Sequence, residues 1–315
     1  MKPIFLAVML TMAAAGYGQG RKQLQAKAHH SAAPVSDTFD GQKAFDYTRQ
    51  VVAFGPRYLD SPGHAKTEQL LKTKLKADNL EVDEFTAQTP LGPKVIRNYI
   101  AKYPGTKDGV IVIAGHYDTL FGRNDFVGAN DAGSSTGLPL ALCDYYRAHT
   151  QGGNKLDGFS VWIVFLDGEE AVKEWTDADS IYGSKHLASK WKQDGTAKQV
   201  KAFILADMVG DRDLALEEDS NSSVGLRKIV YQAAEQRGTQ SHFFRRQNTV
   251  GDDHTAFSAI GIPVVDLIDF DYGYNNAFWH TAQDTMDKLS PQSFQIVGDV
   301  ILGTVHIINE HGGAQ

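Results

Sequence analysis

The chain has 315 residues, of which 42% are hydrophobic and 22% are charged. A chain of this length and composition can bury a large apolar core and needs no disulfide bonds to fold. Its formal net charge is -7, so it offers no basic surface for phosphate groups, and we expect neither nucleic acid nor an anionic membrane as a partner. The sole cysteine, Cys143, follows an apolar run and is predicted to be a small buried residue.

Residues 1–20 have the layout of a secretory signal peptide. They combine one lysine, an apolar run and a stretch of small residues, in that order. We therefore expect an exported protein, periplasmic or secreted, without further membrane association; an uncleaved N-terminal anchor is the alternative. Residues 21–37 are polar and are predicted to form a flexible tail, which leaves residues 38–315 as a single domain that we expect to be monomeric.

The spacing of apolar residues changes repeatedly between that of helices and that of strands. Helical spacing predicts helices at 45–54, 66–76, 135–147, 184–193, 226–237, 254–260 and 291–309. Alternating or continuous β-branched runs predict strands at 82–85, 94–103, 109–119, 159–166, 202–208 and 263–268. The first two strands are expected to pair in antiparallel fashion.

Strands that alternate with helices indicate an α/β fold. We expect a three-layer α/β/α sandwich around a mixed, mostly parallel central sheet. In sheets of this kind, ligand sites form at the carboxyl ends of the strands. Polar residues that follow strands are therefore the first candidates for a functional site.

Five side chains that can bind metal fall at these strand ends or in the loops beside them. They are His116, Glu170 and Asp207 after three successive strands, Asp131 in the Gly-rich loop GANDAGSSTG, and His280 after the last strand. Singly, each such residue is as often a turn or cap residue. Together, two imidazoles and three carboxylates on one rim form a zinc-type ligand set, so we predict a metal site there.

The segment FLDGEEAVKEW places two glutamates side by side after a strand. Adjacent side chains of an extended or looped backbone point in different directions, so Glu169 and Glu170 cannot serve one partner in the same way. One can bind the metal while its neighbour moves protons as a general acid or base. Asp118, two residues after His116, can orient a neighbouring group of the same site.

The order of these motifs resembles that of a known family. His-Xaa-Asp, Asp in a Gly-rich loop, Glu-Glu, Asp and His follow one another as in the zinc-dependent aminopeptidases and their relatives, the animal-type glutaminyl-peptide cyclotransferases (glutaminyl cyclases). The resemblance covers most of the chain from about residue 45 onward. It implies that Asp131, Glu170 and His280 bind one zinc ion, and that His116 and Asp207 complete a second site where one exists.

Three further segments resemble the cyclase branch of that family. They are the double glutamate followed by Trp175 and then by YGSKHLA, the segment GDDHTAF, and the segment FWHTAQDT. Other features differ from the animal cyclases: GANDAGSSTG is more similar to the aminopeptidase loop, Gly251 stands where a glutamine is common, and no cysteine pair is present.

The resemblance implies that the protein converts the N-terminal glutamine of peptides or proteins to pyroglutamate with release of ammonia, using one zinc ion. Glu169 is then the proton carrier, Asp252 and Asp207 are hydrogen-bonded and position the departing nitrogen, and Trp175 and Trp279 wall the pocket.

Other interpretations of the function and of single residues stay open. In a secreted zinc aminopeptidase with two metal ions, Glu169 would activate a metal-bound water. A non-catalytic binding domain on the same fold is the third possibility. For single residues, Asp252 can be a helix N-cap and the two tryptophans can be core aromatics.

Overall fold

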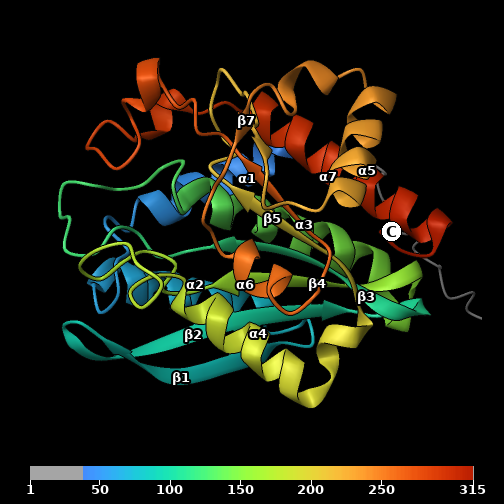
Figure 1. The fold of residues 1–315 in the computed structure, drawn as a ribbon, viewed down its shortest axis with the longest axis horizontal. Helices are drawn as coiled ribbons and strands as arrows, with labels where there is room; N and C mark the ends of the chain where they lie inside the picture. Colours follow the sequence, from blue (N-terminus) through green and yellow to red (C-terminus); the bar gives the residue numbers. More distant parts are fainter. Residues whose placement is uncertain (1–37, 315) are drawn as a thin grey trace, which may run out of the picture. The chain divides into compact units, whose positions relative to one another are not determined.

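A six-stranded mixed sheet lies within residues 38–314, the part of the chain that the computed structural model describes (Figure 1). Its strand order is β1-β2-β4-β3-β5-β8, with bounds Glu81–Thr89 (β1), Gly92–Tyr103 (β2), Gly105–His116 (β3), Leu156–Leu166 (β4), Val200–Asp207 (β5) and Val264–Ile268 (β8). β1 and β2 pair antiparallel, as do β2 and β4, whereas β4, β3, β5 and β8 run parallel. The predicted signal peptide and tail lie outside the described residues.

The central strands are buried on both faces. In β3, Ile111 and Ile113 belong to one apolar cluster, whereas Val110, Val112 and Ala114 belong to a second cluster on the opposite face. Successive side chains of a strand point to opposite faces, which explains the division. The continuous β-branched run in the sequence therefore reflects a strand that is covered on both sides.

Helices cover the two faces unequally. The helices packed on the larger cluster are α1 (Gly41–Val52), α2 (Pro62–Leu75), α3 (Gly133–Thr150), α5 (Val224–Gln236) and α7 (Pro291–His311). The opposite face carries α4 (Tyr182–Asp194) and the short α6 (His254–Ser258), which pack side by side (Figure 1). The predicted three-layer α/β/α sandwich with a mixed, mostly parallel sheet is confirmed.

The remaining elements are short and lie in connections. They are the two-residue strands β6 (Glu218–Asp219) and β7 (Gln247–Asn248) and the 3-10 helices Gln151–Gly153, Thr196–Gln199, Gln240–His242, Tyr274–Asn276 and Met286–Lys288. No helix within residues 38–314 is long and apolar enough to cross a lipid bilayer. Cys143 is fully buried in α3, as predicted.

Helices α1 and α3 approach one another closely at a glycine. A Cβ atom added to Gly137 of α3 would lie 2.0 Å from Thr48 Oγ1 and 2.7 Å from the carbonyl oxygen of Ala44, both in α1. Only a residue without a side chain fits there. This contact fixes the start of α3, and with it the Gly-rich loop that carries Asp131.

Candidate active site

Three of the predicted metal ligands meet at the carboxyl edge of the sheet. His280 Nε2 lies 3.1 Å from Asp131 Oδ2 and 3.3 Å from Glu170 Oε1. One ligand atom from each residue falls within 4.8 Å of the others. The two carboxylates are buried, whereas the His280 side chain is 25% exposed, so the group faces an opening to solvent.

Three oxygen atoms of this group lack a geometrically good hydrogen bond, although His280 Nε2 lies close to two of them. Asp131 Oδ2 and both carboxylate oxygens of Glu170 are buried and accept no hydrogen bond within residues 38–314. Burying such oxygens costs folding free energy unless a cation or a proton interacts with them. Two carboxylates and one imidazole that leave a fourth position open match the ligand set of catalytic zinc. The residues present therefore fit that metal.

The ligands differ in their readiness to lose protons. Although burial opposes the effect, the contacts of His116 and His280 hold the pKa of Asp131 below its usual range. Burial and the Asp131 carboxylate raise the pKa of Glu170 to about 7, against the opposing influence of His280. Metal ligands must be deprotonated, so a cation at this position would displace the proton that Glu170 otherwise tends to hold.

The predicted second metal site has a different character. His116 Nε2 lies 3.0 Å from Asp207 Oδ1 and 3.4 Å from Asp131 Oδ1, and Ser135 donates a hydrogen bond of 2.6 Å to the same Asp207 oxygen. His116 Nδ1 lies 3.1 Å from the carbonyl oxygen of Asp118, which can only accept, so this nitrogen carries a proton. Although burial lowers it, Asp207 and the neighbouring carboxylates raise the pKa of His116 well above its usual value. His116 and Asp207 thus form a buried ion pair with one another.

Asp118 holds the backbone of the glutamate pair. Its two carboxylate oxygens accept hydrogen bonds from the N–H groups of Glu169 and Glu170, at 3.1 and 3.2 Å. The sequence predicted that Asp118 orients a neighbouring group, and the group is this peptide segment. Because both amides are fixed to one carboxylate, the two side chains leave the backbone in defined and different directions.

Asp284 holds the loop that carries Asp131. Its carboxylate oxygens accept hydrogen bonds from the N–H groups of Asn130 and Asp131, at 2.8 and 3.1 Å. Arg57, which is fully buried, donates to the carbonyl oxygen of Gly128 at 2.7 Å in the same loop. The Asp131 carboxylate, a candidate metal ligand, therefore rests on a backbone that is fixed from both sides.

Three residues at the site have positive φ angles, which are uncommon outside glycine. They are Ala132 (φ 68°) directly after Asp131, Met208 (φ 50°) directly after Asp207, and His280 itself (φ 54°). Such conformations cost energy and persist where the surrounding structure enforces them, often at functional sites. Their grouping here supports a functional role for this edge of the sheet.

Glu169 points away from the partners of Glu170. It is buried, and its Oε2 lies 3.8 Å from His116 Nδ1, whereas Glu170 faces His280. Burial raises the pKa of Glu169 well above its usual value; the His116 charge opposes this, and the carboxylates of Asp252, Glu170 and Asp253 add to it. A carboxyl group with a raised pKa takes up a proton more readily than an ordinary one, and a general acid or base must both take up and return a proton.

Asp252 lies in the same buried group: burial and then the neighbouring Asp207 charge raise the pKa of Asp252 well above its usual value. Within the described part of the chain, Asp252 Oδ2 has no hydrogen-bond donor, and the predicted bond to Asp207 stays a prediction. Two carboxylates can bond only through a proton, and Asp207 already contacts Ser135 and His116. The N-cap of α6 is Asp253, not Asp252, and the Asp253 side chain makes no capping bond.

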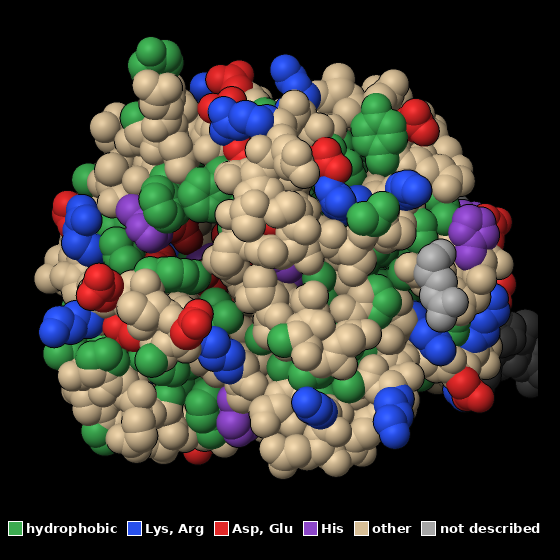
Figure 2. All heavy atoms as spheres, viewed as in Figure 1, with side chains coloured by type: hydrophobic (Ala, Val, Ile, Leu, Met, Phe, Trp, Pro, Cys, Tyr) green, Lys and Arg blue, Asp and Glu red, His purple; other side chains and the backbone are tan. Residues whose placement is uncertain are grey.

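A cavity of about 460 Å³ opens above these residues. Its floor is polar and its walls are partly apolar. The floor is formed by Asp131, Glu169, Glu170, Asp207 and Asp252, and the apolar wall residues include Leu120, Trp175, Val250, Phe270 and Trp279. Figure 2 shows a hollow in which histidine and acidic side chains lie between hydrophobic ones.

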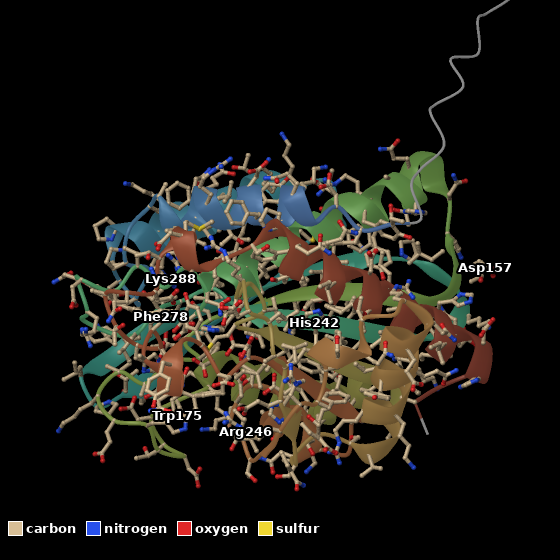
Figure 3. The ribbon with its side chains drawn as sticks, turned by 90° about the horizontal axis from the view of Figure 1, so that it is seen from above. Asp157, Trp175, His242, Arg246, Phe278 and Lys288 are labelled. Carbon is tan, nitrogen blue, oxygen red and sulfur yellow. The ribbon has the colours of Figure 1, made fainter. Side chains whose placement is uncertain are left out.

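Both predicted tryptophans line this cavity. Trp175 is 45% exposed and projects from the loop between β4 and α4, so it is not a core residue (Figure 3). Trp279 is partly buried, stacks on His280 with ring centroids 4.0 Å apart, and contacts Phe270 at 5.1 Å. An apolar wall beside partnerless carboxylates can hold a short side chain against the polar floor.

Residues 98–305 match the sequence profile of peptidase family M28. The chain belongs to this family. The cyclase resemblance is also confirmed. The chain is 29% identical to a bovine glutaminyl-peptide cyclotransferase-like protein over 257 residues, which cover 73% of this chain and 66% of the bovine protein's length.

Solved structures give the same relationship. The glutaminyl cyclase of an Acidobacteriales bacterium is 46% identical, with a TM-score of 0.84, over 91% of this chain and 100% of that one. The Porphyromonas gingivalis glutaminyl cyclase is 26% identical, with a TM-score of 0.74, over 86% of this chain and 99% of that one. The site described above thus lies in an M28 domain whose structural relatives include bacterial glutaminyl cyclases.

The sequence patterns did not predict several residues that build this M28 site. Ser135, Asp284 and Arg57 hold site residues or their loops, yet none stands at a strand end. Asp284 follows His280 by four residues in HTAQD, but spacing alone does not reveal which backbone its carboxylate reaches. Arg57 is far away in sequence and carries no local signal.

Proposed function

We propose that this chain is a zinc-dependent glutaminyl-peptide cyclotransferase that converts the N-terminal glutamine of peptides to pyroglutamate and releases ammonia. The observation that carries the proposal is one three-ligand group, Asp131, Glu170 and His280, at the floor of a cavity walled by Trp175 and Trp279. The bacterial glutaminyl cyclase that is 46% identical supports the same reaction.

Ring closure needs no water. The substrate's α-amine nitrogen forms a bond to the carbonyl carbon of its own side-chain amide, and the bond from that carbon to the amide nitrogen breaks, so that one ammonia leaves. Zinc bound by Asp131, Glu170 and His280 would supply a Lewis acid for the amide oxygen. The rest of the reaction falls to the protein's own side chains.

We assign the proton transfers to Glu169. Its carboxylate would take a proton from the attacking amine and return one to the departing nitrogen, so that no net proton is consumed. The raised pKa of Glu169 suits both steps. Asp252 and Asp207 lie beside it on the cavity floor and would position the departing nitrogen.

The apolar walls would orient the substrate. Trp175 and Trp279 flank the floor, and between them a glutamine side chain would be held close to its own amine, which favours an intramolecular attack. A cavity of about 460 Å³ is larger than one glutamine residue and leaves room for the residues that follow it, which suits peptide substrates.

An aminopeptidase remains the second candidate, since His116, Asp131 and Asp207 also place ligand atoms within 4.8 Å of one another. One bound metal ion is expected for the cyclase and two for the aminopeptidase, so the metal content per chain distinguishes the two functions. The two functions also differ in their products. If a glutamine-first peptide is incubated with the purified protein, loss of ammonia from the intact peptide supports cyclisation, and release of free glutamine would refute it.

We also propose that the protein acts outside the cytoplasm. The support is the signal-like order of residues 1–20. Fractionation of cells that express the full chain, with N-terminal sequencing of the product, tests this directly: a mature protein that still begins at Met1 in the cytosol would contradict it.

A further inference from the structure

The loop between β4 and α4 presents Trp175 to the cavity without packing the indole into the core. From Lys173 to Ala178 every residue of this loop is exposed. Within the described residues, the Trp175 ring stacks on no other ring. Gly251 lies nearby: a Cβ atom added to it would lie 4.0 Å from the indole Nε1. The backbone conformation of this loop therefore has a large part in placing the indole.

A single buried carboxylate organises that backbone. Asp179 is 3% exposed and accepts hydrogen bonds of 2.9 Å from three consecutive N–H groups, those of Val172, Lys173 and Glu174. The Tyr182 hydroxyl donates a fourth bond of 2.6 Å to the same carboxylate. Successive N–H groups that converge on one anion form a compact and rigid arrangement.

The other end of the loop is tied down as well. The N–H group of Asp179 and the hydroxyl of Ser180 both donate to the carbonyl oxygen of Thr176, at 3.0 and 2.8 Å. Lys185 of α4 donates to the carbonyl oxygen of Asp177 at 2.5 Å. Trp175 thus lies between Glu174, whose amide is bound by Asp179, and Thr176, whose carbonyl is bound by the same turn.

We propose that Asp179 is a positioning residue for substrate binding: its carboxylate fixes the loop so that Trp175 stands as a wall of the cavity. The role of Trp175 in substrate binding rests on the proposed function. The effect of Asp179 on the loop conformation does not depend on that function, so an experiment can refute either claim without the other.

Hydrogen exchange tests the loop without any substrate. In Asp179→Ala, the amides of Val172, Lys173 and Glu174 lose their acceptor, and we expect them to exchange at least about tenfold faster while β4 and α4 keep their protection. The control is Asp177→Ala, which removes an exposed carboxylate from the same loop, and there exchange should be unchanged. Unchanged protection in Asp179→Ala would overturn the proposal.

A milder variant, Tyr182→Phe, allows the same test if Asp179→Ala does not fold. Tyr182→Phe removes one of the four bonds to Asp179 and keeps the ring in its apolar cluster with Ile96 and Val172. We expect a smaller acceleration of exchange confined to the same three amides. Exchange equal to that of the parent protein would count against the proposal.

Kinetics test the consequence for substrate. With a glutamine-first peptide, Asp179→Ala should raise KM about tenfold and change kcat by less than about threefold, because a displaced wall costs binding more than chemistry. Zinc content should stay at the parent value. In the double variant with Trp175→Ala, KM should match that of Trp175→Ala alone, since Asp179 acts through that side chain.

The outcomes separate the two claims. If the two substitutions multiply in their effect on KM, or if kcat falls with KM unchanged, Asp179 does not act by positioning Trp175. If the parent protein forms no pyroglutamate at all, the proposed function fails, and the exchange experiment still decides whether Asp179 holds the loop.

Discussion

His116 Nε2 lies 3.0 Å from Asp207 Oδ1, at the junction of β3 and β5. In a two-metal enzyme of this ligand order, these atoms would face a cation. Here they contact each other, and His280 Nε2 likewise lies 3.1 Å from Asp131 Oδ2 and 3.3 Å from Glu170 Oε1. Asp131 contacts both histidines and so joins the two halves of the ligand set, which makes the number of zinc ions per chain a quantity to be measured.

The two neighbouring glutamates should separate metal binding from turnover. Glu170→Gln should weaken zinc binding by at least about tenfold, because it removes a charged ligand. Glu169→Gln should retain one zinc ion and lose about 10²–10⁴-fold in kcat, because an amide cannot carry the proton. Zinc titration followed by steady-state kinetics measures both. Equal loss of metal in the two variants would show that the roles are not divided.

Asp284 should matter for zinc affinity although it is not a ligand. Asp284→Ala leaves the buried N–H groups of Asn130 and Asp131 without acceptors, which should lower the free energy of unfolding by roughly 2–4 kcal/mol and weaken zinc binding. Asp287→Ala, an exposed carboxylate three residues away, serves as the control. Chemical denaturation and zinc titration check the pair, and equal stability of both variants would contradict this account of the loop.

The buried pair of His64 and Asp167 should make stability depend on pH. His64 Nε2 lies 2.7 Å from Asp167 Oδ1; although burial opposes it, this carboxylate raises the pKa of His64 to about 9. A pKa raised above the unfolded value of 6.5 stabilises the fold fully below pH 6.5, and the contribution is lost as pH rises towards 9.

The matching measurement compares the parent with His64→Gln. The difference in the free energy of unfolding between the two proteins should shrink by up to about 3 kcal/mol between pH 6 and pH 10. Urea denaturation at several pH values gives this difference directly. A difference that stays constant across the range would mean that the imidazole is neutral in the folded protein.

The contact between α1 and α3 gives a stability prediction at a glycine. Gly137→Ala forces a methyl group against Thr48 and the carbonyl oxygen of Ala44, and should destabilise the protein by roughly 2–4 kcal/mol. Gly251→Ala is the matched control: it meets only the Trp175 indole at 4.0 Å and should stay within about 0.5 kcal/mol of the parent. A thermal denaturation scan that finds the two variants equally stable would refute the packing argument.

The sequence predicted the sheet, and the grouping of the candidate ligands at its carboxyl edge, because both leave local patterns. A β-branched run such as VIVIAG indicates a strand buried on both faces, and polar residues directly after it must lie at the carboxyl edge. His116 and Glu170 were found in this way. Asp118 was also found, since its position two residues after His116 places it at the same edge.

Side-chain partners across loops could not be predicted. Asp284 and Arg57 reach the backbone of other segments, and Asp179 reaches amides five to seven residues before it in its own loop. No spacing in the sequence encodes these contacts. The expected bond between Asp252 and Asp207 stays a prediction, because a hydrogen bond between two carboxyl groups requires a proton on one of them. A list of carboxylates does not show which of them is already engaged, here by Ser135 and His116.

The central claim is ring closure at one zinc ion, and a competition between two peptides tests it most directly. The zinc-loaded protein is incubated with an equal mixture of two peptides that differ only in their first residue, glutamine or leucine, and the masses of both are followed. We expect the glutamine peptide to lose one ammonia and keep its full length, while the leucine peptide stays unchanged. Shortening of either peptide by its first residue would contradict the account and identify an aminopeptidase.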